Sequence, residues 1–192
     1  LTKQRNPDHA LKILFKEAEP LQTFYQLIAA MEANKPPKGW PVVHAVYVRD
    51  ILVLRVGIEV PLRSKNLSGL RLNNHLHFDE KKGLWRVVVE KKELKNRTSP
   101  HAREIDRYYS AETSALLTEY VTFHRQHLKG ADQCDLLFLS SGSGVPKKDP
   151  LSFEVANLWQ IVARLSKKYL GVSIGANVFR HLIATAVLKD DP

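Results

Sequence analysis

The sequence predicts a mostly α-helical α+β domain in which helices accompany a small three-stranded antiparallel sheet. Apolar residues recur at helical spacing in the first third and in the last part of the chain, and short β-prone runs fill the stretch between them. Prolines and glycines separate these segments, as they do at the ends of helices and strands. A chain of 192 residues is long enough for one domain of ordinary size.

Two longer helices and one short helix are expected before the sheet. Residues 21–34 carry apolar side chains at helical spacing, and the prolines and glycine of 35–41 end that helix. Residues 42–56 are largely apolar, which suits a buried helix. Pro61 then interrupts the chain, and a short helix is expected within 59–72.

Three β-prone runs follow and predict the sheet. The first two lie around 72–78 and 84–90, and the turn at Gly83 between them indicates a hairpin. The basic loop 91–100 leads to a third short strand in "HAREID" (101–106).

The rest of the chain is expected to be helical. Ser110 is a plausible N-cap for a helix that stops at Gly130, and Ser152 for a helix that stops at Gly171. The three expected helices cover 111–128, 153–170 and 177–189.

Charge and composition narrow the class of partner. The formal net charge is +9 and the cations fall in groups, which favours a phosphate polyanion, although a basic protein without such a partner has the same composition. No run of about eighteen apolar residues indicates a membrane span. Cys134 is the only cysteine, so no internal disulfide or thiolate metal cluster is expected, and a reducing, cytoplasmic compartment fits.

No metal site is expected either. His75 and His77 are the histidines with the closest spacing, and they are interpreted as surface residues that alternate along a strand.

Basic residues in three segments stand out from the pattern around them. Arg63 follows Pro61 at the start of a helix, where the helix dipole disfavours a cation. Arg180 lies at the start of an apolar helix. Each has an ordinary interpretation, as an exposed or snorkelling side chain, and the loop lysines are commonly solvated. The loop lysines are Lys91, Lys92 and Lys95.

The order of these segments resembles the catalytic domain of the tyrosine recombinases, or phage-type integrases. The first arginine box of that family has the form Gly-Leu-Arg-x-Ser-Glu-Leu-x-x-Leu, and "PLRSKNLSGL" matches it at Leu62, Arg63, Leu67 and Leu70. The second box, His-x-x-Arg-His before a small and apolar helix, is matched by "NVFRHLIAT" at Arg180, His181, Ala184 and Thr185. A lysine-bearing hairpin lies between the boxes, and the resemblance covers about 21–192.

The resemblance implies the fold of DNA breaking-rejoining enzymes and a cofactor-free transesterification of DNA. A tyrosine attacks phosphorus and forms a 3′-phosphotyrosyl link, which keeps the bond energy for rejoining. Arg63 and Arg180 would clamp the nonbridging phosphate oxygens, and Lys95, with Lys92 as second choice, would protonate the leaving 5′-oxygen. Asn177 would hydrogen-bond the phosphate where the family usually has histidine.

The same resemblance implies double-stranded DNA as partner and a tetramer assembled on it. Residues 1–20 are interpreted as an arm or linker from a missing N-terminal DNA-binding domain, and 21–192 as a catalytic domain truncated at its C-terminal end. The candidates for contacts to the DNA backbone are Lys65, Arg71, Lys92, Arg97, Lys147, Lys148 and Lys167.

Three departures from the family, of which Asn177 in place of histidine is the first, keep alternatives open. Asn66 stands where an acidic residue often supports the first arginine, and all six tyrosines precede Arg180, whereas the family's nucleophile follows it. We expect that tyrosine beyond residue 192. The alternatives are a DNA-binding module of the same fold that has lost its chemistry, and a helical adaptor whose basic faces bind acidic proteins.

Overall fold

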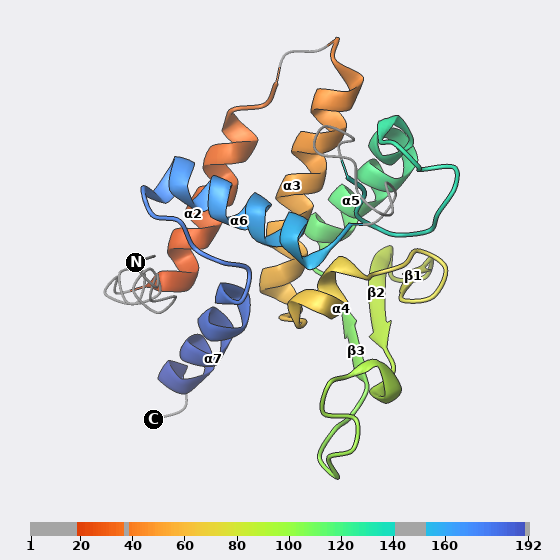
Figure 1. Cartoon of the computed structure of the whole chain (residues 1–192), viewed down its shortest axis with the longest axis vertical. Helices are drawn as coiled ribbons and strands as arrows, with labels where there is room; N and C mark the ends of the chain where they lie inside the picture. The colour runs from red at the N-terminus through yellow and green to blue at the C-terminus, as the bar shows by residue number, and fades with distance from the viewer. Residues whose placement is uncertain (1–18, 37–38, 141–152, 191–192) are drawn as a thin grey trace, which may run out of the picture.

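The computed structural model describes residues 19–36, 39–140 and 153–190, and its elements follow the predicted order (Figure 1). The helices are α2 (Pro20–Ala33), α3 (Pro41–Glu59), α4 (Ser64–Ser68), α5 (Ala111–Glu119), α6 (Val155–Leu170) and α7 (Val178–Asp190). The strands are β1 (Leu76–Asp79), β2 (Leu84–Val89) and β3 (Ile105–Tyr108).

Helix α3 lies at the centre of the helical part. Its second half is almost wholly apolar and buried, and α2, α5, α6 and α7 all contact it. Helix α2 contributes a buried stripe of Phe24, Leu27, Ile28 and Met31, the spacing that the sequence predicts. No helix among the described residues is long and apolar enough to cross a membrane.

The sheet is antiparallel with the order β1–β2–β3. In β2, Val87 and Val89 are buried, and the indole N–H of Trp85 donates to the hydroxyl of Thr118 on α5 at 2.9 Å. Strand β1 begins four residues later than predicted, because the N–H of Leu72 donates to the carbonyl of Asp135 and not to a neighbouring strand. Strand β3 covers 105–108 and not 101–106.

The predicted helix 111–128 is shorter in the structure. The N-cap Ser110 is confirmed, since its side chain accepts from the N–H of Thr113 at 3.2 Å. Helix α5 ends at Glu119, and a wider π turn (Tyr120–His124) and a 3-10 turn follow. There Arg125 turns inward, where its guanidinium donates to the backbone carbonyls of Ala131, Cys134 and Leu136.

Helix α6 begins with a capping box between Glu154 and Asn157, while the predicted cap Ser152 lies outside the described residues. It ends, as predicted, at Gly171, whose φ of +74° lies in the left-handed region that favours glycine. A short turn then leads into α7.

Candidate functional site

Arg63 sits at the junction between the break at Pro61 and helix α4. Its backbone is extended (φ −63°, ψ 146°), and the buried side chains of Leu62 and Leu67 fix the segment on either side. The side chain is half-buried, and its Nη1 donates to the Asn96 Oδ1 at 3.4 Å. No carboxylate of the described residues pairs with Arg63. Its charge is therefore left for an external anion.

The loop between β2 and β3 (90–104), called the lysine loop below, carries the three lysines that the sequence singles out, and all three are exposed. The Nζ of Lys92 lies 2.6 Å from the carboxylate of Glu90, whose hydrogen bond and charge raise the pKa of Lys92. Lys95 has no ion pair with a described residue. Because the ammonium group of Lys92 is engaged with Glu90, Lys95 is the better candidate of the two for contact with an external group.

Helix α7 is fixed by the aromatic ring of Phe179. This ring packs directly on Gly57 of α3, where an added Cβ would lie 2.6 Å from it, and edge-on against Phe24 of α2. Arg180, the next residue, is exposed and has no ion pair with a described residue. Although Val178, Phe179 and Leu182 around it are buried, Arg180 is exposed, as is His181.

Three hydrogen bonds link the segments that carry these residues. The hydroxyl of Ser64 donates to the Asn177 Oδ1 at 3.2 Å, which joins the start of α4 to the start of α7. Arg63 contacts Asn96, and the Asn66 Nδ2 donates to a backbone carbonyl of the lysine loop at 3.2 Å. Helix α4 therefore lies between the lysine loop and the first turn of α7.

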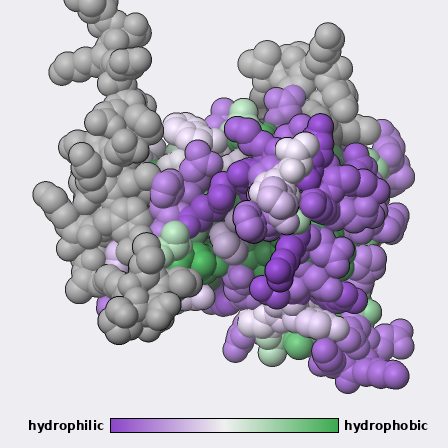
Figure 2. Space-filling model, turned by 90° about the horizontal axis from the view of Figure 1, so that it is seen from below, coloured by the Kyte–Doolittle hydropathy of each residue, from purple (hydrophilic) through white to green (hydrophobic). Residues whose placement is uncertain are grey.

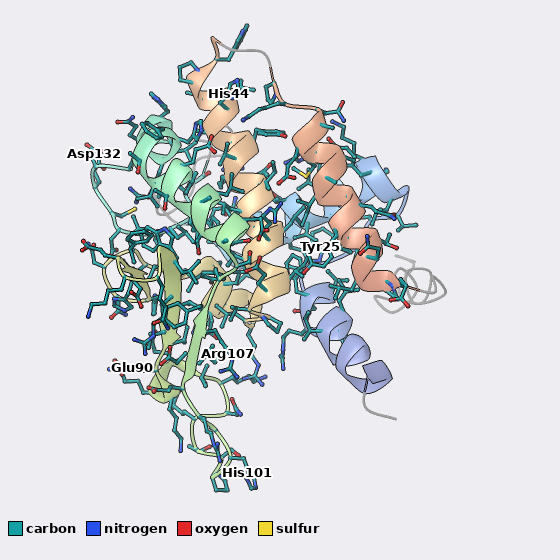
Figure 3. The ribbon with its side chains drawn as sticks, turned by 180° about the vertical axis from the view of Figure 1, so that it is seen from behind. Tyr25, His44, Glu90, His101, Arg107 and Asp132 are labelled. Carbon is teal, nitrogen blue, oxygen red and sulfur yellow. The ribbon has the colours of Figure 1, made fainter. Side chains whose placement is uncertain are left out.

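These elements share one end of the molecule. In Figure 1 the lysine loop and α7 both project downward from the helical part. Figure 3 shows Glu90, Arg107 and His101 toward this end, with His44 and Asp132 toward the opposite one. The view onto this end in Figure 2 is dominated by hydrophilic side chains over the described surface.

The other predicted DNA-binding residues differ in their surroundings. Lys65 and Arg97 are exposed beside the Arg63 segment, and Lys167 is exposed near the end of α6. Arg71 forms an ion pair with Asp135, so its charge is already compensated. Lys147 and Lys148 lie outside the described residues.

Four tyrosines have a hydroxyl that is buried or already hydrogen-bonded within the protein. Tyr109 and Tyr120 are fully buried, and burial raises the pKa of both. The hydroxyl of Tyr47 donates to the carbonyl of Met31, and that of Tyr108 to the Asp79 carboxylate at 2.9 Å. These four side chains are therefore unsuited to attack phosphorus.

The prediction that His75 is a surface residue was wrong. His75 is 6% exposed, because β1 begins only at Leu76 and the preceding turn directs the imidazole inward to Glu93, 2.9 Å away. His77 is exposed, as predicted. No group of three or more acidic, histidine or cysteine side chains among the described residues could hold a metal ion.

A pocket of about 790 Å³ lies elsewhere, between α2, α3 and α6. Its lining includes Tyr47, Arg49, Trp159 and Arg164, and none of the four catalytic candidates. Of those candidates, Lys95, Asn177 and Arg180 are exposed and Arg63 is half-buried. No sequence signal marks Ser64 or Asn96 as a contact of the site, since Ser64 is an ordinary helix-start residue and Asn96 an ordinary loop residue.

Comparison with known proteins finds a likeness in fold and none in sequence. No protein-family model and no curated protein sequence matches this chain. Among the solved structures similar in fold are XerH site-specific recombinase bound to difH substrate in a pre-cleavage complex, and the same recombinase bound to palindromic difH substrate in a post-cleavage complex. Each has a TM-score of 0.61 and 15% sequence identity over 89% of this chain and 42% of the recombinase chain.

This likeness confirms the predicted fold class, a mostly helical domain with a three-stranded antiparallel sheet similar to that of a tyrosine recombinase. The chain spans less than half the length of the recombinase that it matches. At this level of identity the likeness concerns the fold alone.

Proposed function

We propose that this chain contributes the phosphate-binding part of a site-specific DNA recombinase of the tyrosine type. Its partner would be double-stranded DNA, bound by a tetramer in the cytoplasm. The observation that supports the proposal most directly is the half-buried Arg63, which has no carboxylate partner among the described residues and contacts the lysine loop through Asn96. A partly buried guanidinium without a counter-ion favours an anion such as phosphate.

The proposed reaction is an in-line displacement at a DNA phosphodiester. A tyrosine hydroxyl loses its proton to solvent water as its oxygen forms a bond to phosphorus and the bond from phosphorus to the 5′-oxygen breaks. Lys95 transfers a proton from its Nζ to that leaving oxygen. Arg63 and Arg180 donate to the nonbridging oxygens, whose negative charge grows in the transition state. All six tyrosines of the sequence precede Arg180, so we propose that the nucleophile lies beyond residue 192.

Asn177 favours a second candidate function, a DNA-binding domain without strand cleavage. Its amide oxygen accepts from Ser64, and an amide cannot transfer a proton at neutral pH. In this alternative, Asn177 serves only to hold α7 against α4, and the cations bind DNA without chemistry.

A covalent trapping experiment distinguishes the two. Duplexes that bind the full-length gene product would be selected from a random pool, then nicked close to the target phosphate so that a cleaved strand diffuses away. The recombinase proposal predicts a covalent protein–DNA adduct. It also predicts that Arg180→Ala lowers the rate of adduct formation by about 10²–10³-fold, the usual effect of losing one transition-state donor, while DNA binding is largely kept.

Arg55→Ala is the matched control, because Arg55 pairs with Glu32 at 2.7 Å and belongs to none of the three segments. The control variant should form adduct at the normal rate. An unchanged adduct yield for Arg180→Ala would overturn the role of Arg180, and DNA binding without any adduct in the unmodified protein would favour the second candidate.

A further inference from the structure

A buried histidine and a glutamate connect the lysine loop to the turn before β1. The His75 Nδ1 accepts from the backbone N–H of Arg71 at 3.0 Å. Because a backbone N–H can only donate, the His75 Nδ1 that accepts from it carries no proton. The single N–H proton of the neutral imidazole is therefore on Nε2. The Glu93 carboxylate, 2.9 Å from Nε2, is thus the acceptor for this N–H, in preference to the Asn74 amide nitrogen at 3.2 Å.

Glu93 is held at its backbone as well as at its side chain. Its carbonyl oxygen accepts from the Asn66 Nδ2 of α4 at 3.2 Å, and its N–H donates to the carbonyl of Glu90 at 3.0 Å. Asn66 stands where the family has an acidic residue that supports the first arginine. In this chain its side chain fixes the loop instead.

Lys95 lies between this anchored residue and a second contact. It follows Glu93 by two residues and precedes Asn96, whose side chain accepts from Arg63 at 3.4 Å. Two residues of extended chain span at most about 7 Å. While the Asn66–Glu93 and Arg63–Asn96 hydrogen bonds are formed, the backbone of Lys95 therefore stays close to Arg63.

We propose that His75 and Glu93 are positioning residues, which hold the loop so that Lys95 presents its ammonium group beside Arg63. The inference rests on the proposed function for the role of Lys95. Neither residue touches the DNA in this scheme. His75 is buried beneath the loop, and the carboxylate of Glu93 is engaged with it, so both act through the position of Lys95.

The test compares two leaving groups at the scissile phosphate. In one duplex the bridging 5′-atom is oxygen, and in the other it is sulfur. A thiol has a pKa of about 8.5 and leaves as the thiolate, so the sulfur duplex needs no general acid. A variant that only misplaces the general acid is therefore slow on the oxygen duplex and normal on the sulfur duplex.

Glu93→Ala in the full-length gene product should slow adduct formation on the oxygen duplex on the order of 10²-fold and leave the sulfur duplex within a few-fold of normal. Glu93→Gln keeps an acceptor oxygen for the His75 N–H and should restore most of the rate. Lys95→Ala should show the same selective defect, and the double variant should be no slower than Lys95→Ala alone. Glu104→Ala, an exposed carboxylate later in the same loop, is the matched control and should be normal.

Equal defects of Glu93→Ala on both duplexes, or no defect on either, would overturn the positioning role. If the unmodified protein forms no adduct on either duplex, the proposed function fails instead. The loop is then tested by hydrogen exchange: Glu93→Ala, but not Glu104→Ala, should speed exchange of the amides at 93–97 by tenfold or more, and unchanged exchange would refute the anchoring itself.

Discussion

The most deeply buried charges of the described residues join two helices that are far apart in the sequence. Arg49 and Asp50 of α3 are 4% and 3% exposed, and the Asp50 carboxylate also accepts from Arg164 of α6 at 2.5 Å. Arg49 further donates to the carbonyl of Leu139 at 2.7 Å. One carboxylate therefore balances two guanidinium groups, of which only that of Arg164 reaches solvent.

Asp50→Asn should lower the free energy of unfolding by roughly 3–5 kcal/mol, because it leaves the buried guanidinium of Arg49 without a counter-charge. Arg164→Ala should cost less than about 1 kcal/mol, since its side chain is 56% exposed and screened by water. Urea denaturation followed by circular dichroism measures both. Equal losses for the two variants would contradict the assignment of the penalty to Arg49.

The sequence was sufficient to single out candidate site residues, but not to predict which side chains they contact. The sequence singled out Arg63, Lys95 and Arg180 because each conflicts with the local pattern or matches a family motif. The burial of Arg49 and His75 depends on partners that lie far away in the sequence, the Leu139 carbonyl for Arg49 and the Glu93 carboxylate for His75. No pattern of neighbouring residues encodes such contacts.

At the scale of elements, the position of α7 depends on a close approach to α3. The ring of Phe179 occupies the space above Gly57, where any larger residue would collide with it. Within a helix, alanine is ordinarily about 1 kcal/mol more favourable than glycine. Gly57 therefore makes α3 less favourable as an isolated helix than alanine would. The close contact with Phe179 of α7 explains why glycine is needed at this position.

Gly57→Ala should destabilise the protein by about 1–3 kcal/mol despite the gain in helix propensity, because its methyl group would lie 2.6 Å from the ring of Phe179. Thermal unfolding measures the change. Phe179→Leu should recover part of the loss when combined with Gly57→Ala, since the smaller side chain leaves room for the methyl group. A stabilised Gly57→Ala variant would argue against the close packing of α7 on α3.

Helices were predicted more closely than the ends of strands and the shape of turns. Helix α2 was displaced by one residue from its predicted bounds, because its apolar spacing and its flanking prolines are both local signals. Strand β1 lost its first residues to a contact with Asp135, and the helix from Ser110 ended early where Arg125 turns inward. Both differences arise from contacts between segments, which local periodicity does not contain.

At the scale of the whole molecule, the net charge of +9 indicates an affinity for polyanions without saying where they bind. Under the proposed function the duplex would lie over Lys65 and Arg97, which are exposed close to Arg63 and have no ion pair with a described residue. Lys129 is exposed and carries the same charge, and Asp132, three residues later in the chain, lies toward the opposite end from His101 of the lysine loop in Figure 3. If DNA contacts one end of the molecule, loss of Lys65 or Arg97 should affect binding more than loss of Lys129. If net charge alone attracts DNA, loss of any of the three charges should have the same effect.

Lys65→Ala and Arg97→Ala should each reduce the slope of log Kobs against log salt concentration by about 0.9, because each removes one phosphate contact and one released counter-ion. Lys129→Ala removes the same charge and should weaken binding at low salt only slightly, with the slope unchanged. Fluorescence anisotropy with a labelled duplex at several salt concentrations measures all three. Equal changes for the three variants would mean that net charge alone governs binding, whereas a change confined to Lys65 and Arg97 would locate the duplex at the end of the molecule that carries Arg63.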